Sequence, residues 1–151
     1  MSTDWSPMRG FFADSAAQAM VELALTLPLL VFSVLGGADL ARAFALQIAI
    51  ENGARAGAES YAIDSTPTTA EAQSAVINEI NRTPTANASA SNVTVTKAQS
   101  DGVTACVSPP TLATPCFVSV RVVYGWTTLI AWPLVPNSGT FDRTTIIRTF
   151  F

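Results

Sequence analysis

The spacing of hydrophobic residues changes along the chain, from one long apolar run to strict alternation. Residues 17–58 are mostly apolar, and their pattern predicts one long helix. Its uncharged core, residues 23–38, would be about 24 Å long as an α-helix. A bilayer's hydrocarbon is slightly thicker, at about 30 Å. Tilting or sliding can draw on the apolar residues that follow, so the run predicts a membrane-spanning helix.

Three charged residues mark the ends of this apolar core. Glu22 lies at its start, and Asp39 and Arg42 lie at its end, where their spacing predicts an ion pair on one helix face. A lone carboxylate in hydrocarbon costs about 2.5 to 3.5 kcal/mol. From the residues alone, Glu22 therefore either has a partner or lies at the level of the lipid headgroups. Pro28 removes one backbone hydrogen bond and is expected to kink or loosen the helix.

Beyond the apolar core, the helical pattern continues with a side of small residues and a polar side. It is expected to end near residues 64–67. Gly53 and Gly57 on the small side have the small-xxx-small spacing that lets another backbone approach closely. Two partners fit this spacing, namely the chain's own domain and another subunit.

The remainder of the chain predicts a short helix followed by strands. Thr68 and Glu71 form a capping-box signature with apolar residues at helical spacing after it, which predicts a helix over residues 69–81. Alternating residues predict strands at 93–97 and 117–126. The second of these strands is expected to bury one face and to turn the other toward solvent.

The C-terminal residues are expected to complete an antiparallel sheet. Residues 126–134 should extend the preceding strand or pair with it, residues 136–139 should turn, and residues 143–151 should form a final strand. The predicted fold class is α+β, in which a long N-terminal transmembrane helix continues into a small antiparallel β-sheet domain.

Composition limits the chemistry that the chain can perform. Charged residues make up 13% of the chain, the formal net charge is −3, and the eight Lys and Arg are scattered, which argues against a nucleic-acid binder. The chain has no histidine and two cysteines, which removes the usual zinc and haem ligand sets and any Ser-His or Cys-His catalytic pair. We therefore expect no enzyme activity, no cofactor and no metal.

The two cysteines flank a proline-rich segment. A disulfide between Cys106 and Cys116 would close a loop and stabilise the fold by about 3 kcal/mol in the chain-entropy model. In a domain outside the cytoplasm, such a pair is expected to be a structural staple rather than a redox site.

Four blocks of residues share their order and spacing with a known family. They are AQAMVELAL at 17–25, LPLL at 27–30, GGADLARA at 36–43 and NGARAGA at 52–58. Together they resemble the TadE-like family, the pseudopilins or minor pilins of bacterial tight-adherence (Flp-type) pilus systems. The residues after these blocks have only the general shape of the family.

The resemblance implies a type IV pilin-like precursor that a prepilin peptidase cuts on the cytoplasmic side of the apolar segment. The cut would fall between Ala17 and Gln18, which makes Glu22 the fifth residue of the mature chain. Ala17 stands where the family usually has glycine, and it is the mildest departure because it is also small. Cleavage would give Gln18 an α-ammonium group. The Glu22 carboxylate of one subunit could meet that group on its neighbour, so that two charges that are costly apart become tolerable together.

The implied organisation has three parts. Residues 1–17 would be a cytoplasmic leader, residues 18–66 the transmembrane and extended helix, and residues 67–151 an extracytoplasmic α+β domain. Arg9, the only cation before the helix, favours a cytoplasmic N-terminus. The implied location is the bacterial inner membrane, crossed once, with the C-terminal domain in the periplasm or outside the cell.

The resemblance also implies partners and a function. The partners are a prepilin peptidase, other pilins or pseudopilins, the inner-membrane pilus assembly platform and the membrane, with no nucleic acid. The function is that of a pseudopilin or minor pilin subunit that takes part in assembling a tight-adherence pilus. One alternative is a membrane-anchored extracytoplasmic protein-binding module that does not assemble into a filament. Another is a secretory signal with its cleavage site at residues 41–43, which would release a soluble domain.

Overall fold

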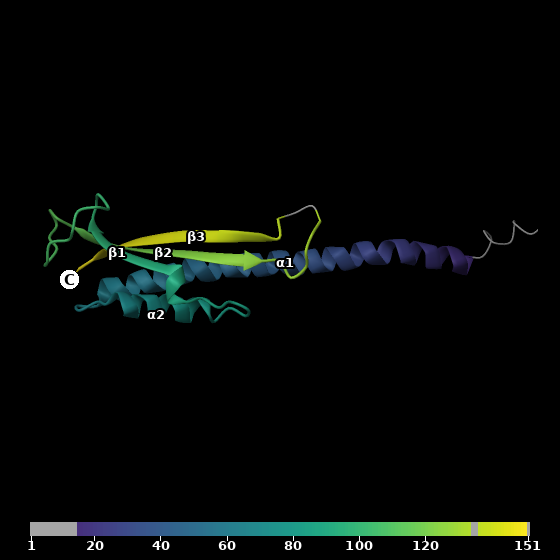
Figure 1. Cartoon of the computed structure of the whole chain (residues 1–151), viewed down its shortest axis with the longest axis horizontal. Helices are drawn as coiled ribbons and strands as arrows, with labels where there is room; N and C mark the ends of the chain where they lie inside the picture. Colours follow the sequence, from purple (N-terminus) through teal and green to yellow (C-terminus); the bar gives the residue numbers. More distant parts are fainter. Residues whose placement is uncertain (1–14, 134–135, 151) are drawn as a thin grey trace, which may run out of the picture. The chain divides into compact units, whose positions relative to one another are not determined.

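The computed structural model describes residues 15–133 and 136–150. Its two α-helices are α1 (Ser15–Ile63) and α2 (Thr69–Ile80), and a short 3-10 turn, η1 (Ala90–Asn92), precedes the strands (Figure 1). The strands are β1 (Val93–Gln99), β2 (Cys116–Thr127) and β3 (Ser138–Thr149). A long apolar N-terminal helix followed by a small antiparallel sheet is the predicted α+β arrangement, which is thereby confirmed.

The chain divides into two compact units, Met1–Leu40 and Ala41–Phe151, and α1 contributes to both. The described part of the first unit is residues 15–40 of α1. A cytoplasmic leader was predicted over residues 1–17, and residues 1–14 of it lie outside the described residues. The predicted boundary between residues 66 and 67 separates a transmembrane and extended helix from an extracytoplasmic domain, and it stays a prediction.

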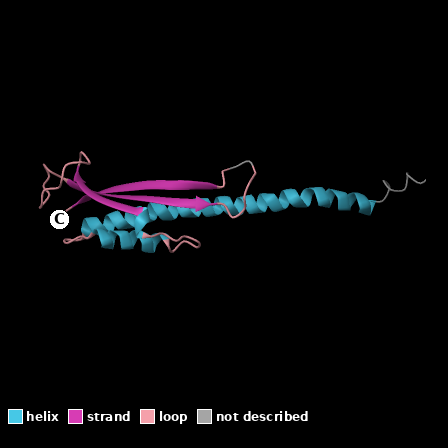
Figure 2. Ribbon diagram, viewed as in Figure 1, coloured by secondary structure: helices cyan, strands magenta, loops and turns pink. Residues whose placement is uncertain are grey.

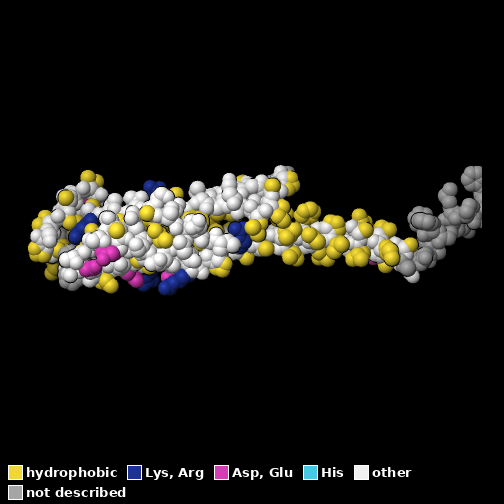
Figure 3. Space-filling view, turned by 60° about the horizontal axis from the view of Figure 1, so that its bottom comes forward, with side chains coloured by type: hydrophobic (Ala, Val, Ile, Leu, Met, Phe, Trp, Pro, Cys, Tyr) yellow, Lys and Arg dark blue, Asp and Glu magenta, His cyan; other side chains and the backbone are white. Residues whose placement is uncertain are grey.

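The first unit exposes apolar side chains around most of its helix. Its described large hydrophobic residues are all exposed, and Figure 3 shows mainly hydrophobic side chains on the visible surface of this segment. Helix α1 continues through Pro28. Two hydroxyls bond back to the helix backbone, from Thr26 Oγ1 to Glu22 O at 2.9 Å and from Ser33 Oγ to Leu29 O at 2.8 Å. These bonds satisfy the hydroxyl donors within the helix itself.

The second unit has a hydrophobic core built from both helices and the sheet. The final half of α1 contributes residues four apart, which lie on one helix face. Apart from Ile50 of α1, the larger side chains come from helix α2 and the inner face of the sheet. The buried residues of this core are Ile50, Ala54, Ala58, Ala62, Val76, Ile80, Ala88, Val93, Val118, Val120 and Val122.

Helix α2 begins with the predicted capping box. Glu71 N donates to Thr68 Oγ1 at 3.2 Å, and Thr68 N donates to Glu71 Oε2 at 3.2 Å. These bonds satisfy donors that the first helical turn leaves open. The helix buries Ala72, Val76 and Ile80 at helical spacing, so the predicted short amphipathic helix is confirmed.

The sheet is a meander in which each strand pairs with its neighbour in the sequence. Its order is β1-β2-β3 with antiparallel pairing throughout, and Figure 2 shows the three strands together as magenta arrows. Val120 is opposite Val95 on one side and Thr145 on the other. Burial alternates along β2, with the even-numbered residues facing the core, so its predicted inward face is confirmed.

The prediction for the connection between β2 and β3 is wrong in part. Strand β2 ends at Thr127, and the described residues 128–133 form no strand. Strand β3 begins at Ser138, so it replaces part of the turn predicted over residues 136–139 and starts before the predicted Arg143. The physical reason is that Ser138 and Thr140 are polar residues on the outer face of the sheet. A pattern of apolar residues gives no signal for strand positions of this kind.

Candidate functional site

Glu22 lies on an exposed turn of α1 with a polar neighbour one turn before it. Gln18 Nε2 donates to Glu22 Oε1 at 3.4 Å, and the residues directly beside Glu22 in the sequence, Val21 and Leu23, are apolar. This neutral amide donor was not among the partners predicted for Glu22 from the sequence. A donor at i−4 was available as a signal, because residues four apart on a helix face each other. The amide lowers the cost of the carboxylate without neutralising its charge.

The predicted processing site lies at the beginning of α1. Ala17 and Gln18 are both exposed, and both belong to the helix, which starts at Ser15. Gln18 therefore serves two roles in the predicted scheme. Its side chain donates to Glu22 within the chain, and its backbone nitrogen would become the ammonium group after cleavage. The cut itself stays a prediction.

The two charged residues at the end of the apolar core differ in burial. Asp39 is 5% exposed, whereas Arg42 is partly buried. Both take part in interactions. Their pairing with each other across one helix turn stays a prediction.

Gly53 and Gly57 lie against α2. A Cβ atom added at Gly53 would lie 2.7 Å from Ile80 Cγ1 and 3.2 Å from the carbonyl oxygen of Val76. One added at Gly57 would overlap Val76 Cγ2 and lie 2.9 Å from the carbonyl oxygen of Ala72. The close approach that this spacing permits is therefore used within the chain, between α1 and α2, and of the two partners left open it is the chain's own domain that occupies this face.

The predicted disulfide between Cys106 and Cys116 is confirmed. The two Cα atoms are 5.5 Å apart, and the bridge ties the loop after β1 to the first residue of β2. Cys116 is buried, and its carbonyl oxygen accepts a bond from Thr149 Oγ1 at 3.4 Å. The bridge thus fixes the loop at the place where β2 and the end of β3 meet.

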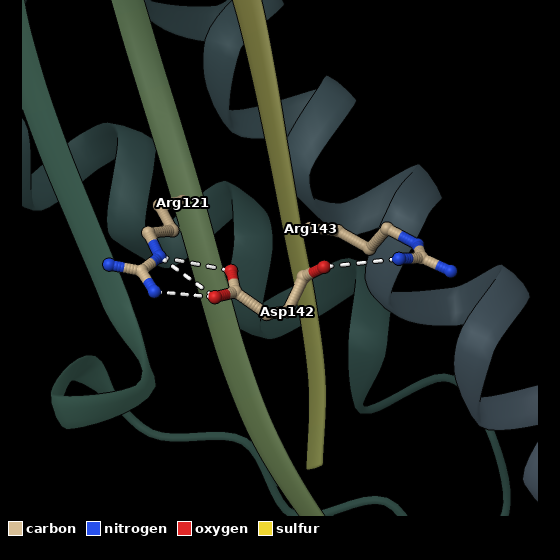
Figure 4. A network of polar contacts seen from close by, with 3 residues as sticks. All are labelled: Arg121, Asp142 and Arg143. Carbon is tan, nitrogen blue, oxygen red and sulfur yellow. Dashed lines mark hydrogen bonds and ion pairs between the residues drawn. The ribbon is translucent and has the colours of Figure 1, made fainter.

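An ion pair crosses the outer face of the sheet (Figure 4). Arg121 on β2 donates to both carboxylate oxygens of Asp142 on β3, with Nε to Oδ1 at 2.9 Å and a second contact from Nη2 to Oδ2. Arg143 Nη1 points to the backbone oxygen of Asp142 at 3.1 Å. The hydrogen bonds from Arg121 hold the pKa of Asp142 below its ordinary value of 3.8, and the same pair raises the pKa of Arg121.

A second exposed carboxylate closes the turn after β1. Asp101 accepts bonds from the Thr104 hydroxyl, from Thr104 N at 2.9 Å and from Val103 N at 3.0 Å. These hydrogen bonds, with the Thr104 hydroxyl first, hold the pKa of Asp101 below 3.8. Gly102, inside this turn, has φ of +74°, a conformation that glycine adopts without strain. Asp101 is therefore engaged in building the turn.

A shallow hollow of about 290 Å³ lies on the outer face of the sheet near this turn. Its lining is uncharged and includes Phe117 and Ile146 beside Thr96 and Ser119. These groups supply contact and hydrogen bonds but no acid, base or nucleophile with a base beside it. Among the described residues, no group of three or more His, Cys, Asp or Glu is placed to hold a metal ion.

The part of α1 that carries Glu22 is also the part that compares with known proteins. Within the described residues, one helix, Ala17–Ile63 of α1, is long and apolar enough to cross a membrane by its length and composition. None of its most apolar window is buried. Residues 17–59 match the model of the TadE-like protein family. The resemblance seen in the sequence is thereby confirmed.

The TadE-like match indicates a protein associated with tight-adherence pilus machinery and with a membrane. It covers the predicted processing site, Glu22, the Asp39 and Arg42 positions and both packing glycines, and it ends before α2 and the sheet. No curated protein and no solved structure matches the chain.

Proposed function

We propose that this chain is a pseudopilin or minor pilin subunit that takes part in assembling a tight-adherence (Flp-type) pilus after a prepilin peptidase cuts between Ala17 and Gln18. The observation that carries the proposal is one carboxylate, Glu22, at the start of an exposed apolar helix that matches the TadE-like family. A permanent anchor gains nothing from a charge at this place, because burying it in hydrocarbon is costly.

Pairing between subunits would explain the presence of the Glu22 carboxylate. Cleavage creates an α-ammonium group on Gln18, one helical turn from Glu22, and a stack of identical helices brings this group near the carboxylate of a neighbour. An isolated buried charge is costly, whereas two opposite charges in contact offset much of that cost. The pairing would therefore set the axial position of each subunit in the assembly.

The second unit fits the same role as a compact extracytoplasmic domain carried by the helix. It is a compact unit with its own core, a capped helix α2 and a disulfide, and a disulfide suits a compartment outside the cytoplasm. The proposed partners are the prepilin peptidase, other pilins or pseudopilins and the inner-membrane assembly platform. The proposal assigns the chain no catalytic role and no cofactor.

The test is the N-terminus of the mature protein after coexpression with a matching prepilin peptidase. Intact mass and N-terminal sequencing should give a chain that begins at Gln18. The variant Ala17→Trp should block the cut, because a bulky residue would not fit where small residues are accepted. The matched control Ala43→Trp changes another small residue of the same helix and should leave the cut unchanged.

Two other results would overturn the proposal. A chain that begins near Phe44, and that Ala43→Trp leaves uncut, would identify a secretory signal and a released soluble domain. A chain that stays uncut in the presence of an active peptidase would favour a permanently anchored protein-binding module.

A further inference from the structure

The connection between β2 and β3 is unusually apolar for a surface loop. Its described residues 129–132 are Leu, Ile, Ala and Trp, and Leu129 is 66% exposed. The sequence has no Asp, Glu, Lys or Arg from residue 122 to residue 141. Surface loops between strands are ordinarily polar, so this composition requires a cause.

Contacts within the second unit show at which end of that unit this loop lies. Gly57 of α1 is level with Val76 of α2 and Val120 of β2, and Gly53 is level with Ile80. Helix α2 therefore runs back along α1, toward the residue at which α1 enters the unit.

Strand β2 runs in that same direction. Asn87, which follows α2, donates its backbone N–H to the hydroxyl of Tyr124 on β2 at 2.9 Å. From Gly57 back to Ala41, α1 covers about 24 Å. From Val120 forward to Thr127, β2 covers about 23 Å. The loop therefore begins level with Ala41, at the end of the unit where the chain enters from its apolar segment.

Asn137 bonds several polar groups of the loop to one another. Thr128 N donates to Asn137 O at 2.9 Å, Trp132 N donates to Asn137 Oδ1 at 2.5 Å, and Asn137 Nδ2 donates to Trp132 O at 3.2 Å. A backbone whose donors and acceptors are already bonded enters a less polar medium at lower cost. Around this closure, Leu129 and Ala131 are exposed, and Ile130 and Trp132 are half-buried.

The opposite end of the sheet differs in its charges. Val103 and Leu112 are exposed there, and Leu112 is 88% exposed. However, the charged Asp101 is hydrogen-bonded to Thr104 and Val103 beside them, and Arg148 Nη2 donates to the backbone oxygen of Thr111 at 3.5 Å. The loop at the end where α1 enters differs in that it carries no charged residue of its own, although the partly buried Arg42 of α1 follows Ala41 there.

From these observations we propose that residues 129–132 lie in the headgroup region of the bilayer that α1 crosses, so that the second unit rests on the membrane surface through this loop. Trp and neighbouring aliphatic residues are favoured at that depth because the indole has an apolar body and a polar N–H. The occupant is a lipid surface, and this inference rests on the membrane anchoring included in the proposed function. The loop gives the domain a second point of membrane contact besides the helix.

The experiment reads the environment of Trp132 in vesicles. The chain has three tryptophans, and Trp5→Phe with Trp126→Phe leaves Trp132 as the only emitter. The full chain is reconstituted into phosphatidylethanolamine and phosphatidylglycerol vesicles, with or without phosphatidylcholine brominated on its acyl chains. Trp132 should lose most of its emission in the brominated vesicles and should be protected from iodide in the water.

The control places a tryptophan at the opposite end of the same domain. Leu112→Trp, made with all three native tryptophans changed to Phe, should be quenched by iodide and should keep its emission in brominated vesicles. Equal behaviour of the two probes would overturn the inference.

Flotation of the same samples separates this inference from the proposed function. If the chain floats with the vesicles but Trp132 keeps its emission in brominated vesicles, the chain is anchored without the loop. That result would overturn only the inference about the loop. A chain that does not float lacks the anchor, and the proposed function fails with it.

Discussion

The two halves of α1 show how one helix is adapted to two environments. In the first half the exposed positions carry large apolar side chains, such as Leu25, which is 74% exposed. In the second half the buried positions carry mostly small ones, such as Ala54 and Ala58, and Ile50 is the largest at 0% exposure. Along the same helix, the first half therefore exposes large side chains, and the second half buries mostly small ones.

The two halves of α1 differ in what covers their hydrophobic side chains. Small residues let α2 and the sheet approach the second half closely, so its core is completed within the chain. Large apolar residues around most of the first half have no such cover among the described residues of their own unit. An exposed apolar surface of this extent marks a partner of another kind, such as a membrane or a neighbouring helix.

The largest effect is expected from the one charge in the first half that precedes the apolar core. Glu22→Ala removes a costly carboxylate from an apolar segment, so membrane insertion should be unchanged or improved. Assembly should be lost, because the partner of the neighbouring ammonium is gone. Surface pilus yield and the membrane-bound fraction of the protein measure the two effects.

The matched control is Glu51→Ala, which removes an exposed glutamate from the second half of the same helix. It should keep both pilus yield and membrane fraction at the wild-type level. Wild-type pilus yield in Glu22→Ala would contradict the role assigned to Glu22.

Truncating one large side chain in each half should separate their sources of stability. Ile50→Ala leaves a cavity in the core and should lower the free energy of unfolding of the second unit by about 2–5 kcal/mol. Leu25→Ala changes an exposed residue and should leave that free energy unchanged. Denaturant unfolding of the full chain in detergent, followed by near-UV circular dichroism, measures both. A similar loss in both variants would mean that the two halves share one core.

Adding a methyl group tests the close approach of α2. Gly57→Ala places a Cβ atom 2.9 Å from the backbone oxygen of Ala72, and backbone cannot move aside as a side chain can. The expected loss is about 1–3 kcal/mol in the free energy of unfolding, measured by thermal denaturation. Gly37→Ala, in the first half, adds a Cβ that meets nothing within 4 Å and should cause no loss. Equal melting temperatures for the two variants would place α2 farther from α1.

The smallest effect should come from exposed charges, which the second unit carries and the apolar core lacks. The pKa of Asp142 is lowered in the folded state, so its contribution to stability is present above the unfolded value near 3.8 and is lost as pH falls through the lower folded value. Carboxyl NMR should detect the lowered pKa of Asp142. In Arg121→Gln the pKa should return toward 3.8, and no change in that variant would contradict the pairing.

Local signals in the sequence were enough to predict most elements. The Thr68 and Glu71 capping box located α2, and the strict alternation of valines located β2 and its inward face. The two cysteines predicted their own bridge. Each of these features depends on residues close together in the sequence or on a fixed period, so it can be predicted from the sequence.

Features that depend on register could not be predicted in the same way. The Arg121 and Asp142 pair exists because Val123 is opposite Asp142 in the sheet, which places the two charges diagonally on one face. The partner of Gly53 and Gly57 depended on the path of α2, and the spacing alone left it open. The apolar residues 129–132 suggested more strand, whereas Asn137 bonds them into a loop.

The meander order of the sheet has a kinetic consequence. Because β1, β2 and β3 pair in chain order, pairing requires no long crossover, and topologies with short sequence separation between contacts fold faster. If the domain crosses a membrane as proposed, with β3 following β1 and β2, the sheet can add one strand at a time as each emerges. Strand β3 pairs with all 12 residues of β2, so the sheet reaches its full width only when β3 has emerged.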